Sequence, residues 1–151
     1  MCYHNCMSEL IVVDTSVLIS ALIGEHGPGR EVIRQCLLGE YKPLISNALF
    51  QEYEDVSKRA KILDLCPLTK SEIKELLNAF YSVCIWTPIY YLWRPNVIDE
   101  GDNFLLELAV KSNSIIVTLN GKDFKKSSEF GIKVMTPKEF LIYIGEIKCK
   151  Q

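Results

Sequence analysis

The feature that most constrains the fold is a run of four apolar residues, Leu10–Val13, that ends abruptly in the polar triplet Asp14-Thr15-Ser16. The run has no polar face and is mostly β-branched, which is typical of a strand covered on both sides in a parallel sheet. Residues 17–23 then have the apolar spacing of a helix and precede a loop rich in glycine. The pattern predicts a buried strand, a polar turn and a helix.

Strand and helix patterns alternate over the rest of the chain. Further strands are expected at 42–45, 83–87, 114–118 and 133–135, and further helices at 28–38, 48–58, after Thr69, from Asp102 and after Thr136. Thr69–Glu72 and Thr136–Glu139 are capping boxes that mark helix starts. The alternation predicts an α/β three-layer sandwich, with a central parallel sheet of four to five strands flanked by helices. We expect one domain at 10–147, a flexible N-terminal extension at 1–9 and a C-terminal tail at 148–151.

Composition limits the classes of protein and partner. The chain has 151 residues, of which 48% are hydrophobic and 24% charged, as in a single globular domain. The net charge of −2 means that a polyanion would have to meet local positive charge. Six widely spaced cysteines predict reduced thiols and a cytoplasmic location. No membrane insertion is expected, because the longest apolar stretch is short and interrupted by polar residues.

Polar and acidic residues are expected to gather at one edge of the predicted sheet. In such folds ligands bind outside the carboxyl ends of the strands, where the chain changes direction across the sheet. Neighbouring carboxylates repel one another unless a cation neutralises them, and hard oxygen ligands suit Mg²⁺ or Mn²⁺. The residues expected at this edge are Asp14, Glu52, Asp102, Thr118, Asn120 and Asp123.

Helix geometry selects Glu52 among the acids of its helix. Glu52 lies about 70° from the centre of the apolar face, whereas Glu54 and Asp55 lie roughly 130° away and are expected to face water. A simpler interpretation makes Glu52 a flank residue of an amphipathic helix. Asp14 and Asp102 likewise have a simpler interpretation as ordinary helix N-caps.

Four stretches, at 12–18, 46–53, 99–105 and 116–124, resemble the PIN-domain family, in particular its VapC-like toxins of toxin–antitoxin pairs. The resemblance implies a PIN-like fold and a metal-dependent endoribonuclease that hydrolyses RNA phosphodiester bonds. It also implies an RNA substrate, a small antitoxin protein that masks the acidic edge, and a homodimer.

The resemblance also implies roles for individual residues. Asp14, Glu52 and Asp102 match the family's first three acids, with Ser16 as the hydroxyl that helps to hold the first. Asn120 stands where many members have Asp, and Asp123 follows as a second acid, which leaves open whether one or two metal ions bind. The expected catalytic residues are Asp14, Glu52, Asp102 and Asp123, and the expected metal ligands are Asp14, Asp102, Asp99 and Glu52. The supporting residues are Ser16, Thr118 and Asn120, and the expected RNA contacts are Arg30, Arg94, Lys122 and Lys125.

Other functions fit the sequence less well. A haloacid dehalogenase-type phosphatase needs an acid where this chain has Ser16, and a receiver domain needs an Asp after its third strand, where this chain has Thr87. The remaining alternative is a catalytically weak PIN-fold module that binds RNA or a partner protein. Asn120 is the residue that favours it.

Overall fold

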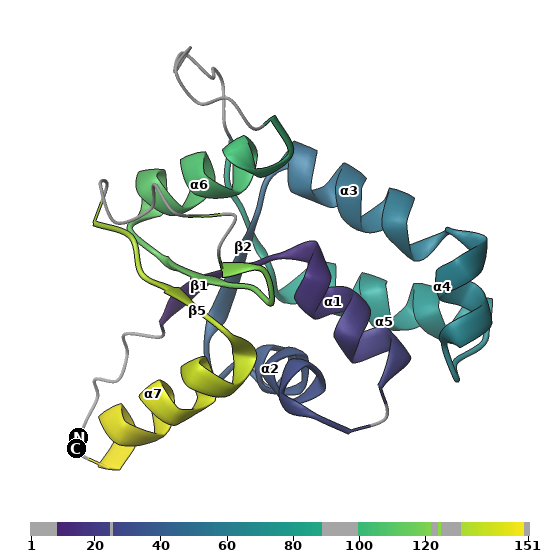
Figure 1. Cartoon of the computed structure of the whole chain (residues 1–151), viewed down its shortest axis with the longest axis horizontal. Helices are drawn as coiled ribbons and strands as arrows, with labels where there is room; N and C mark the ends of the chain where they lie inside the picture. The colour runs from purple at the N-terminus through teal and green to yellow at the C-terminus, as the bar shows by residue number, and fades with distance from the viewer. Residues whose placement is uncertain (1–8, 25, 89–99, 122–123, 125–130, 150–151) are drawn as a thin grey trace.

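The structure is a computed structural model that describes residues 9–24, 26–88, 100–121, 124 and 131–149 (Figure 1), with residues 100–104 and 146–149 described by their backbone alone. The strands are β1 (Leu10–Val13), β2 (Lys42–Ile45), β3 (Ile85–Trp86), β4 (Ile115–Val117) and β5 (Val134–Met135). The helices are α1 (Thr15–Ile23), α2 (Pro28–Leu37), α3 (Asn47–Ser57), α4 (Ala60–Leu65), α5 (Lys70–Val83), α6 (Glu100–Ser112) and α7 (Pro137–Cys149).

The five strands form one parallel sheet in the order β3-β2-β1-β4-β5. The chain builds outward from β1 through β2 to β3, and then returns to place β4 on the other side of β1. The direction of winding therefore reverses between β1 and β4. The carboxyl ends of these two strands form the place where ligands bind in sheets of this kind.

Helices cover both faces of the sheet, which confirms the predicted three-layer fold. In Figure 1, α6 lies above the sheet and contacts β1 and β4, whereas α2 and α7 lie below it and contact each other. The central strands are fully enclosed, since the side chains of Ile11, Val12 and Val13 have no exposed surface. The absence of a polar face in the sequence of β1 is explained by this burial.

The two predicted capping boxes are present. The Thr69 hydroxyl accepts from the backbone of Glu72, whose carboxylate accepts from the backbone of Thr69. The same reciprocal pair joins Thr136 and Glu139 at the start of α7. These two boxes begin α5 and α7 at the positions that the sequence predicts.

Three elements differ from the sequence-based expectation. Helix α4 was not predicted, because none of its six residues is buried and it therefore has no apolar stripe. Strand β3 is limited to Ile85–Trp86, because α5 continues to Val83 and occupies the start of the expected strand. Helix α7 continues to Cys149, two residues beyond the expected end of the domain.

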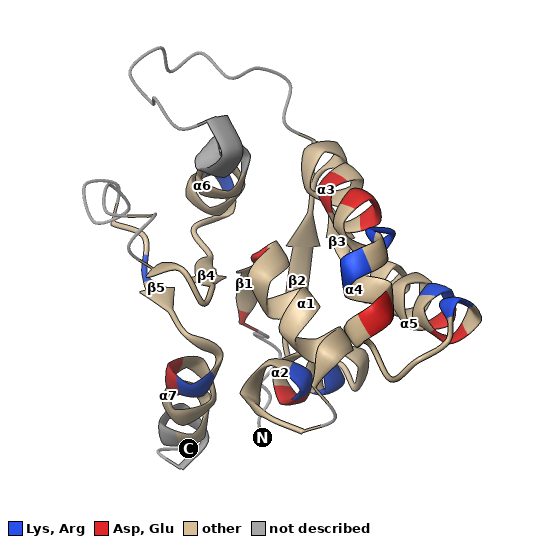
Figure 2. Ribbon diagram, turned by 45° about the vertical axis from the view of Figure 1, so that its right-hand side comes forward, with Lys and Arg blue, Asp and Glu red and all other residues tan. Residues whose placement is uncertain are grey.

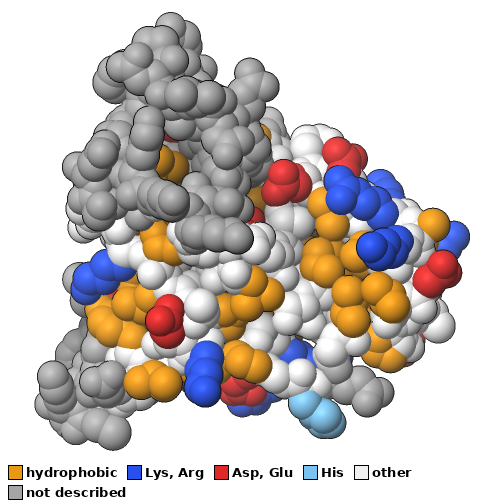
Figure 3. All heavy atoms as spheres, in the orientation of Figure 1, with side chains coloured by type: hydrophobic (Ala, Val, Ile, Leu, Met, Phe, Trp, Pro, Cys, Tyr) orange, Lys and Arg blue, Asp and Glu red, His pale blue; other side chains and the backbone are white. Residues whose placement is uncertain are grey.

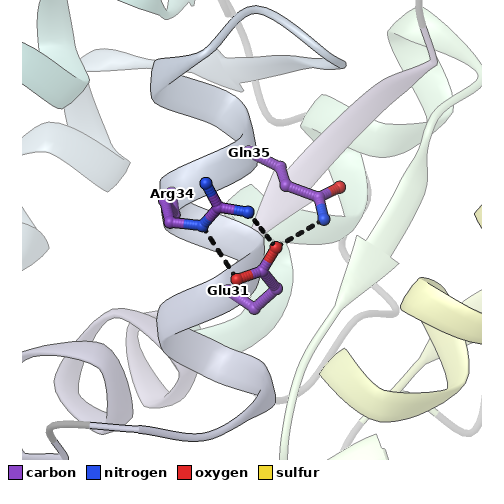
Figure 4. A network of polar contacts seen from close by, with 3 residues as sticks. All are labelled: Glu31, Arg34 and Gln35. Carbon is purple, nitrogen blue, oxygen red and sulfur yellow. Dashed lines mark hydrogen bonds and ion pairs between the residues drawn. The ribbon is translucent and has the colours of Figure 1, made fainter.

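An ion pair with an amide neighbour stabilises the outer surface of α2 (Figure 4). Arg34 donates two hydrogen bonds to the Glu31 carboxylate, at 2.9 and 2.6 Å, and Gln35 donates a third at 2.6 Å. The hydrogen bonds from Arg34, then that from Gln35, lower the pKa of Glu31 to about 2. The carboxylate of Glu31 is therefore engaged within its own helix.

Over the described residues, no helix has the length and apolar character needed to cross a lipid bilayer.

Candidate functional site

Asp14 lies at the carboxyl end of β1, where it meets the end of β4. The strand register places Val13 beside Val117, so the next residues, Asp14 and Thr118, are neighbours. The Thr118 hydroxyl donates a hydrogen bond of 2.5 Å to Oδ2 of Asp14. The Ser16 hydroxyl donates a second, of 3.0 Å, to the same oxygen. The structure thus brings together three of the predicted site residues.

The Asp14 carboxylate does not cap the helix that follows it. Asp14 occupies the N-cap position of α1, yet its side chain accepts no capping hydrogen bond. Ser46, at the same position before α3, does accept one from the backbone N–H of Leu49. The interpretation of Asp14 as an ordinary N-cap therefore does not explain what its carboxylate does.

The Asp14 carboxylate is a nearly buried charge, with 8% of the residue exposed. Both side-chain hydrogen bonds reach Oδ2, and from the residues that the structure describes Oδ1 receives none. The same described part of the chain supplies no ion pair to Asp14 or Glu52. A buried carboxylate without a cationic partner is costly, and a cation bound at Oδ1 would offset that cost.

The hydroxyls of Ser16 and Thr118 also fix the loop that follows β4. The backbone N–H of Leu119 donates to Ser16 at 3.1 Å, and that of Asn120 donates to Thr118 at 3.0 Å. Each hydroxyl therefore donates to Asp14 and accepts from this loop. Asn120 is attached to the site through its backbone, and its side chain is exposed.

Glu52 is joined to the same segment by a residue that the sequence analysis did not select. The Thr15 hydroxyl donates a short hydrogen bond to Oε2 of Glu52. The hydroxyls of two consecutive residues thus donate hydrogen bonds to the two acids, Thr15 to Glu52 and Ser16 to Asp14. The position of Thr15 directly after Asp14 was the signal in the sequence that could have identified it.

Glu52 is half-buried, as its helical position indicates, but the expectation for Glu54 was wrong. Glu54 is also half-buried, because its carboxylate accepts a hydrogen bond of 2.7 Å from Tyr81 and lies 3.4 Å from the ammonium of Lys58. The partner that turns Glu54 inward comes from α5, which its own helix could not reveal. Asp55 is exposed, as expected.

Tyr53, next to Glu52 on α3, contacts Val13, the residue before Asp14. Its hydroxyl donates a hydrogen bond of 2.5 Å to the carbonyl oxygen of Val13. Burial raises the pKa of Tyr53 well above its ordinary value, so the hydroxyl remains a donor. Helix α3 is thus bound to the end of β1 through a fully buried side chain.

Several predicted site residues lie outside the described residues: Asp99, Asp123, Arg94, Lys122 and Lys125. Asp102 lies in the first turn of α6, with its side chain outside the description. Since α6 ends at Ser112 and leads into the amino end of β4, its first turn lies towards the carboxyl edge of the sheet. The topology therefore places the backbone of Asp102 at the edge that carries Asp14.

The structure does not bring Arg30 to Asp14. Arg30 lies in α2 and donates a hydrogen bond of 2.7 Å to the carbonyl oxygen of Gly24, at the end of α1. The nine residues of α1 separate that carbonyl from Asp14 by about 13 Å along the helix axis. Arg30 links α2 to the end of α1 through this hydrogen bond and does not lie at the acidic edge.

Two acids of the expected cluster are present among the described side chains, Asp14 and Glu52. Within that part of the chain, no group of three or more His, Cys, Asp and Glu side chains forms a complete metal site. Both acids offer carboxylate oxygens, which are the donors that Mg²⁺ and Mn²⁺ prefer. Figure 2 shows that, among the residues it colours, the charged ones lie chiefly on the helices.

Comparisons with known proteins found a matching family model and a similar protein. The family model of the PIN domain matches residues 10–122. The chain is also similar to the uncharacterized protein MJ1680 of Methanocaldococcus jannaschii, with 29% identity over 153 residues that cover 87% of this chain and 88% of that protein. The chain belongs to the PIN-domain family. PIN domains are generally nucleases, and those nucleases generally use divalent metals.

Proposed function

We propose that this chain is a metal-dependent endoribonuclease that hydrolyses RNA phosphodiester bonds. The observation that carries the proposal is the carboxylate of Asp14. It lies where the winding of the sheet reverses, it does not cap its helix, and two hydroxyls hold one of its oxygens while the other faces no described donor. In a PIN domain, such a carboxylate fits a ligand for a divalent cation.

Asp14, Glu52, Asp102 and Asp99 would hold Mg²⁺ or Mn²⁺, with Asp123 as a further catalytic acid. A divalent cation supplies Lewis-acid chemistry, which makes water nucleophilic near neutral pH and offsets charge on the departing oxygen. Ser16 and Thr118 donate hydrogen bonds to Oδ2 of Asp14, which would leave Oδ1 for the cation. Asn120 supports the site through its backbone bond to Thr118.

Positive side chains that can meet RNA phosphates gather at the junction of α3 and α4. Lys58, Arg59 and Lys61 are all exposed there, and Figure 3 shows Lys and Arg side chains on the right of the molecule. Glu52 and Lys58 are six positions apart, which corresponds to about 9 Å along α3. An RNA strand that leaves the acidic edge along α3 would reach this basic surface. Arg94, Lys122 and Lys125 are proposed as additional phosphate contacts.

We also propose a biological setting for the activity. The likeness to VapC-like toxins supports a role as the toxin of a toxin–antitoxin pair in the cytoplasm, with a small antitoxin that covers the acidic edge, and a homodimeric state.

The test is divalent-dependent cleavage of single-stranded RNA by the purified chain. We expect cleavage with Mg²⁺ or Mn²⁺, its loss with EDTA, and a decrease of at least a hundredfold for Asp14→Asn. Asp55→Asn is the matched control, because Asp55 is an exposed acid on α3, and it should cleave at the wild-type rate. Equal cleavage by wild type and Asp14→Asn would refute the proposed mechanism.

A second candidate function is a PIN-fold module that binds RNA or a partner with weak catalysis or none. Asn120 favours it, because an amide at this position removes one negative charge from the acidic edge. The variant Asn120→Asp separates the candidates. If the native site is weakly catalytic because it lacks that acid, the substitution should raise both the Mn²⁺ affinity and the cleavage rate. If the native chain is already a competent nuclease, both quantities should change less than threefold.

A further inference from the structure

We propose that Thr15 and Tyr53 are positioning residues that together fix Glu52 relative to Asp14. This inference rests on the proposed function, because it concerns how the two acids are presented to a cation. Two hydrogen bonds carry it, that from Thr15 to Glu52 and that from Tyr53 to Val13. Neither Thr15 nor Tyr53 belongs to the set of residues predicted from the sequence.

The two hydrogen bonds lie on either side of Asp14. Glu52 and Tyr53 are consecutive on α3, and their partners, Thr15 and Val13, are the two chain neighbours of Asp14. A single contact would let α3 rotate about it. Two contacts from adjacent residues to both neighbours of one acid restrict how α3 can move relative to that acid.

The peptide bond between Val13 and Asp14 is held from both sides. Its N–H donates to the carbonyl of Val117 in β4 at 2.9 Å, and its carbonyl oxygen accepts from Tyr53 at 2.5 Å. Because the C=O and N–H of a trans peptide point in opposite directions, these partners lie on opposite sides of β1. The paired residues of β1 and β2 end at Ile11, two residues before Val13, and Tyr53 supplies the donor to the carbonyl oxygen of Val13.

The bond from Thr15 restricts a side chain that would otherwise be mobile. A glutamate has several rotatable bonds, and ordering such a side chain when a ligand binds reduces the affinity. Thr15 is buried and β-branched, so its hydroxyl has few alternative positions. The carboxylate of Glu52 is therefore oriented before any cation binds.

The test measures Mn²⁺ affinity by calorimetry, without RNA. We expect Thr15→Val and Tyr53→Phe each to weaken Mn²⁺ binding by about tenfold to a hundredfold, the range seen when groups that orient metal ligands are removed. Thr15→Ser keeps the hydroxyl and should stay within threefold of wild type. Tyr81→Phe is the matched control for Tyr53→Phe, because it removes a tyrosine hydrogen bond to another acid of α3, Glu54.

A purely structural role predicts a different pattern. Thr15→Val and Tyr53→Phe would then lower the unfolding temperature but leave the Mn²⁺ affinity at the wild-type value, and that result would overturn the proposal. Positioning also predicts that Thr15→Val causes no further loss of affinity in a Glu52→Gln background. An equal loss in both backgrounds would show that Thr15 does not act through Glu52.

A metal-free measurement separates this inference from the proposed nuclease function. If the wild type binds no Mn²⁺, the proposed function fails, and the pairing of Thr15 with Glu52 is then judged by thermal unfolding in EDTA. Thr15→Val, Glu52→Gln and the double variant form a double-mutant cycle. Positioning requires that the two unfolding-temperature shifts are not additive, and additive shifts would overturn it whatever the metal result.

Discussion

Thr118 and Asp14 are 104 residues apart in sequence, yet the Thr118 hydroxyl donates a 2.5 Å hydrogen bond to the Asp14 carboxylate. The bond crosses between two strands that are neighbours because the chain returns to the centre of the sheet for β4. The topology therefore adds a donor from a distant part of the sequence to the one that Ser16 supplies from nearby.

Removing the Thr118 hydroxyl should destabilise the fold as well as the site. We expect Thr118→Val to lower the free energy of unfolding by about 1–3 kcal/mol, because a buried charged acceptor loses a donor. Urea denaturation in EDTA measures the effect, and Thr118→Ser should recover most of it. An unchanged urea midpoint for Thr118→Val would mean that this bond contributes nothing to stability.

The basic surface at Lys58, Arg59 and Lys61 should control RNA affinity without affecting the metal. We expect Arg59→Glu combined with Lys61→Glu to weaken binding of single-stranded RNA at least tenfold at low salt. The slope of log affinity against log salt concentration should become less steep by about 0.7 for each phosphate contact that is lost. Fluorescence anisotropy over a range of salt concentrations measures both quantities.

A control with the same change in charge shows whether the location matters. Lys42→Glu with Lys138→Glu alters two exposed lysines on β2 and α7 and should lower affinity much less. If both double variants bind RNA equally weakly, the effect comes from net charge, and α3 does not guide the RNA. Calorimetric Mn²⁺ affinity should match the wild type in both.

The Glu31 carboxylate should make stability depend on pH in the acidic range. Its pKa falls from the ordinary value of 4.5 to about 2, chiefly through the hydrogen bonds from Arg34. A lowered pKa in the folded state stabilises the protein fully above pH 4.5, and the stabilisation disappears as the pH falls towards 2. The melting-temperature difference between wild type and Glu31→Gln should therefore narrow over this range, as followed by circular dichroism. A difference that stays constant would contradict the shift.

The parts of the fold with strong local signals could be predicted from the sequence. The β-branched run at β1 and the capping boxes before α5 and α7 depend only on residues within a few positions of one another, and they appear where expected. Helix α4 has no buried residue, so no periodic apolar pattern in the sequence predicted it. The length of β3 depended on where α5 ends, which the apolar pattern did not define.

The candidate site could be predicted in part for the same reason. The rule that parallel strands end at one edge places Asp14 and Thr118 at the same edge from the order of elements alone, and the pairing of β1 with β4 brings them together. The partners of Thr15 and Tyr53 depend on how α3 lies against β1, which periodicity cannot give. Glu54 was misjudged because its partner, Tyr81, belongs to another helix.

The uncapped start of α1 has a consequence for how this protein could be stabilised. An N-cap side chain that bonds to its helix contributes about 1 kcal/mol, and Asp14 forgoes that contribution while also keeping a charge nearly buried. Asp14→Ser should bind no Mn²⁺ and should melt near the wild-type temperature in EDTA, because the new cap and the removal of the buried charge offset the lost hydrogen bonds from Ser16 and Thr118. A selection for heat resistance alone would therefore tolerate the loss of the proposed metal ligand, since the Asp14 side chain does not cap the helix that follows it.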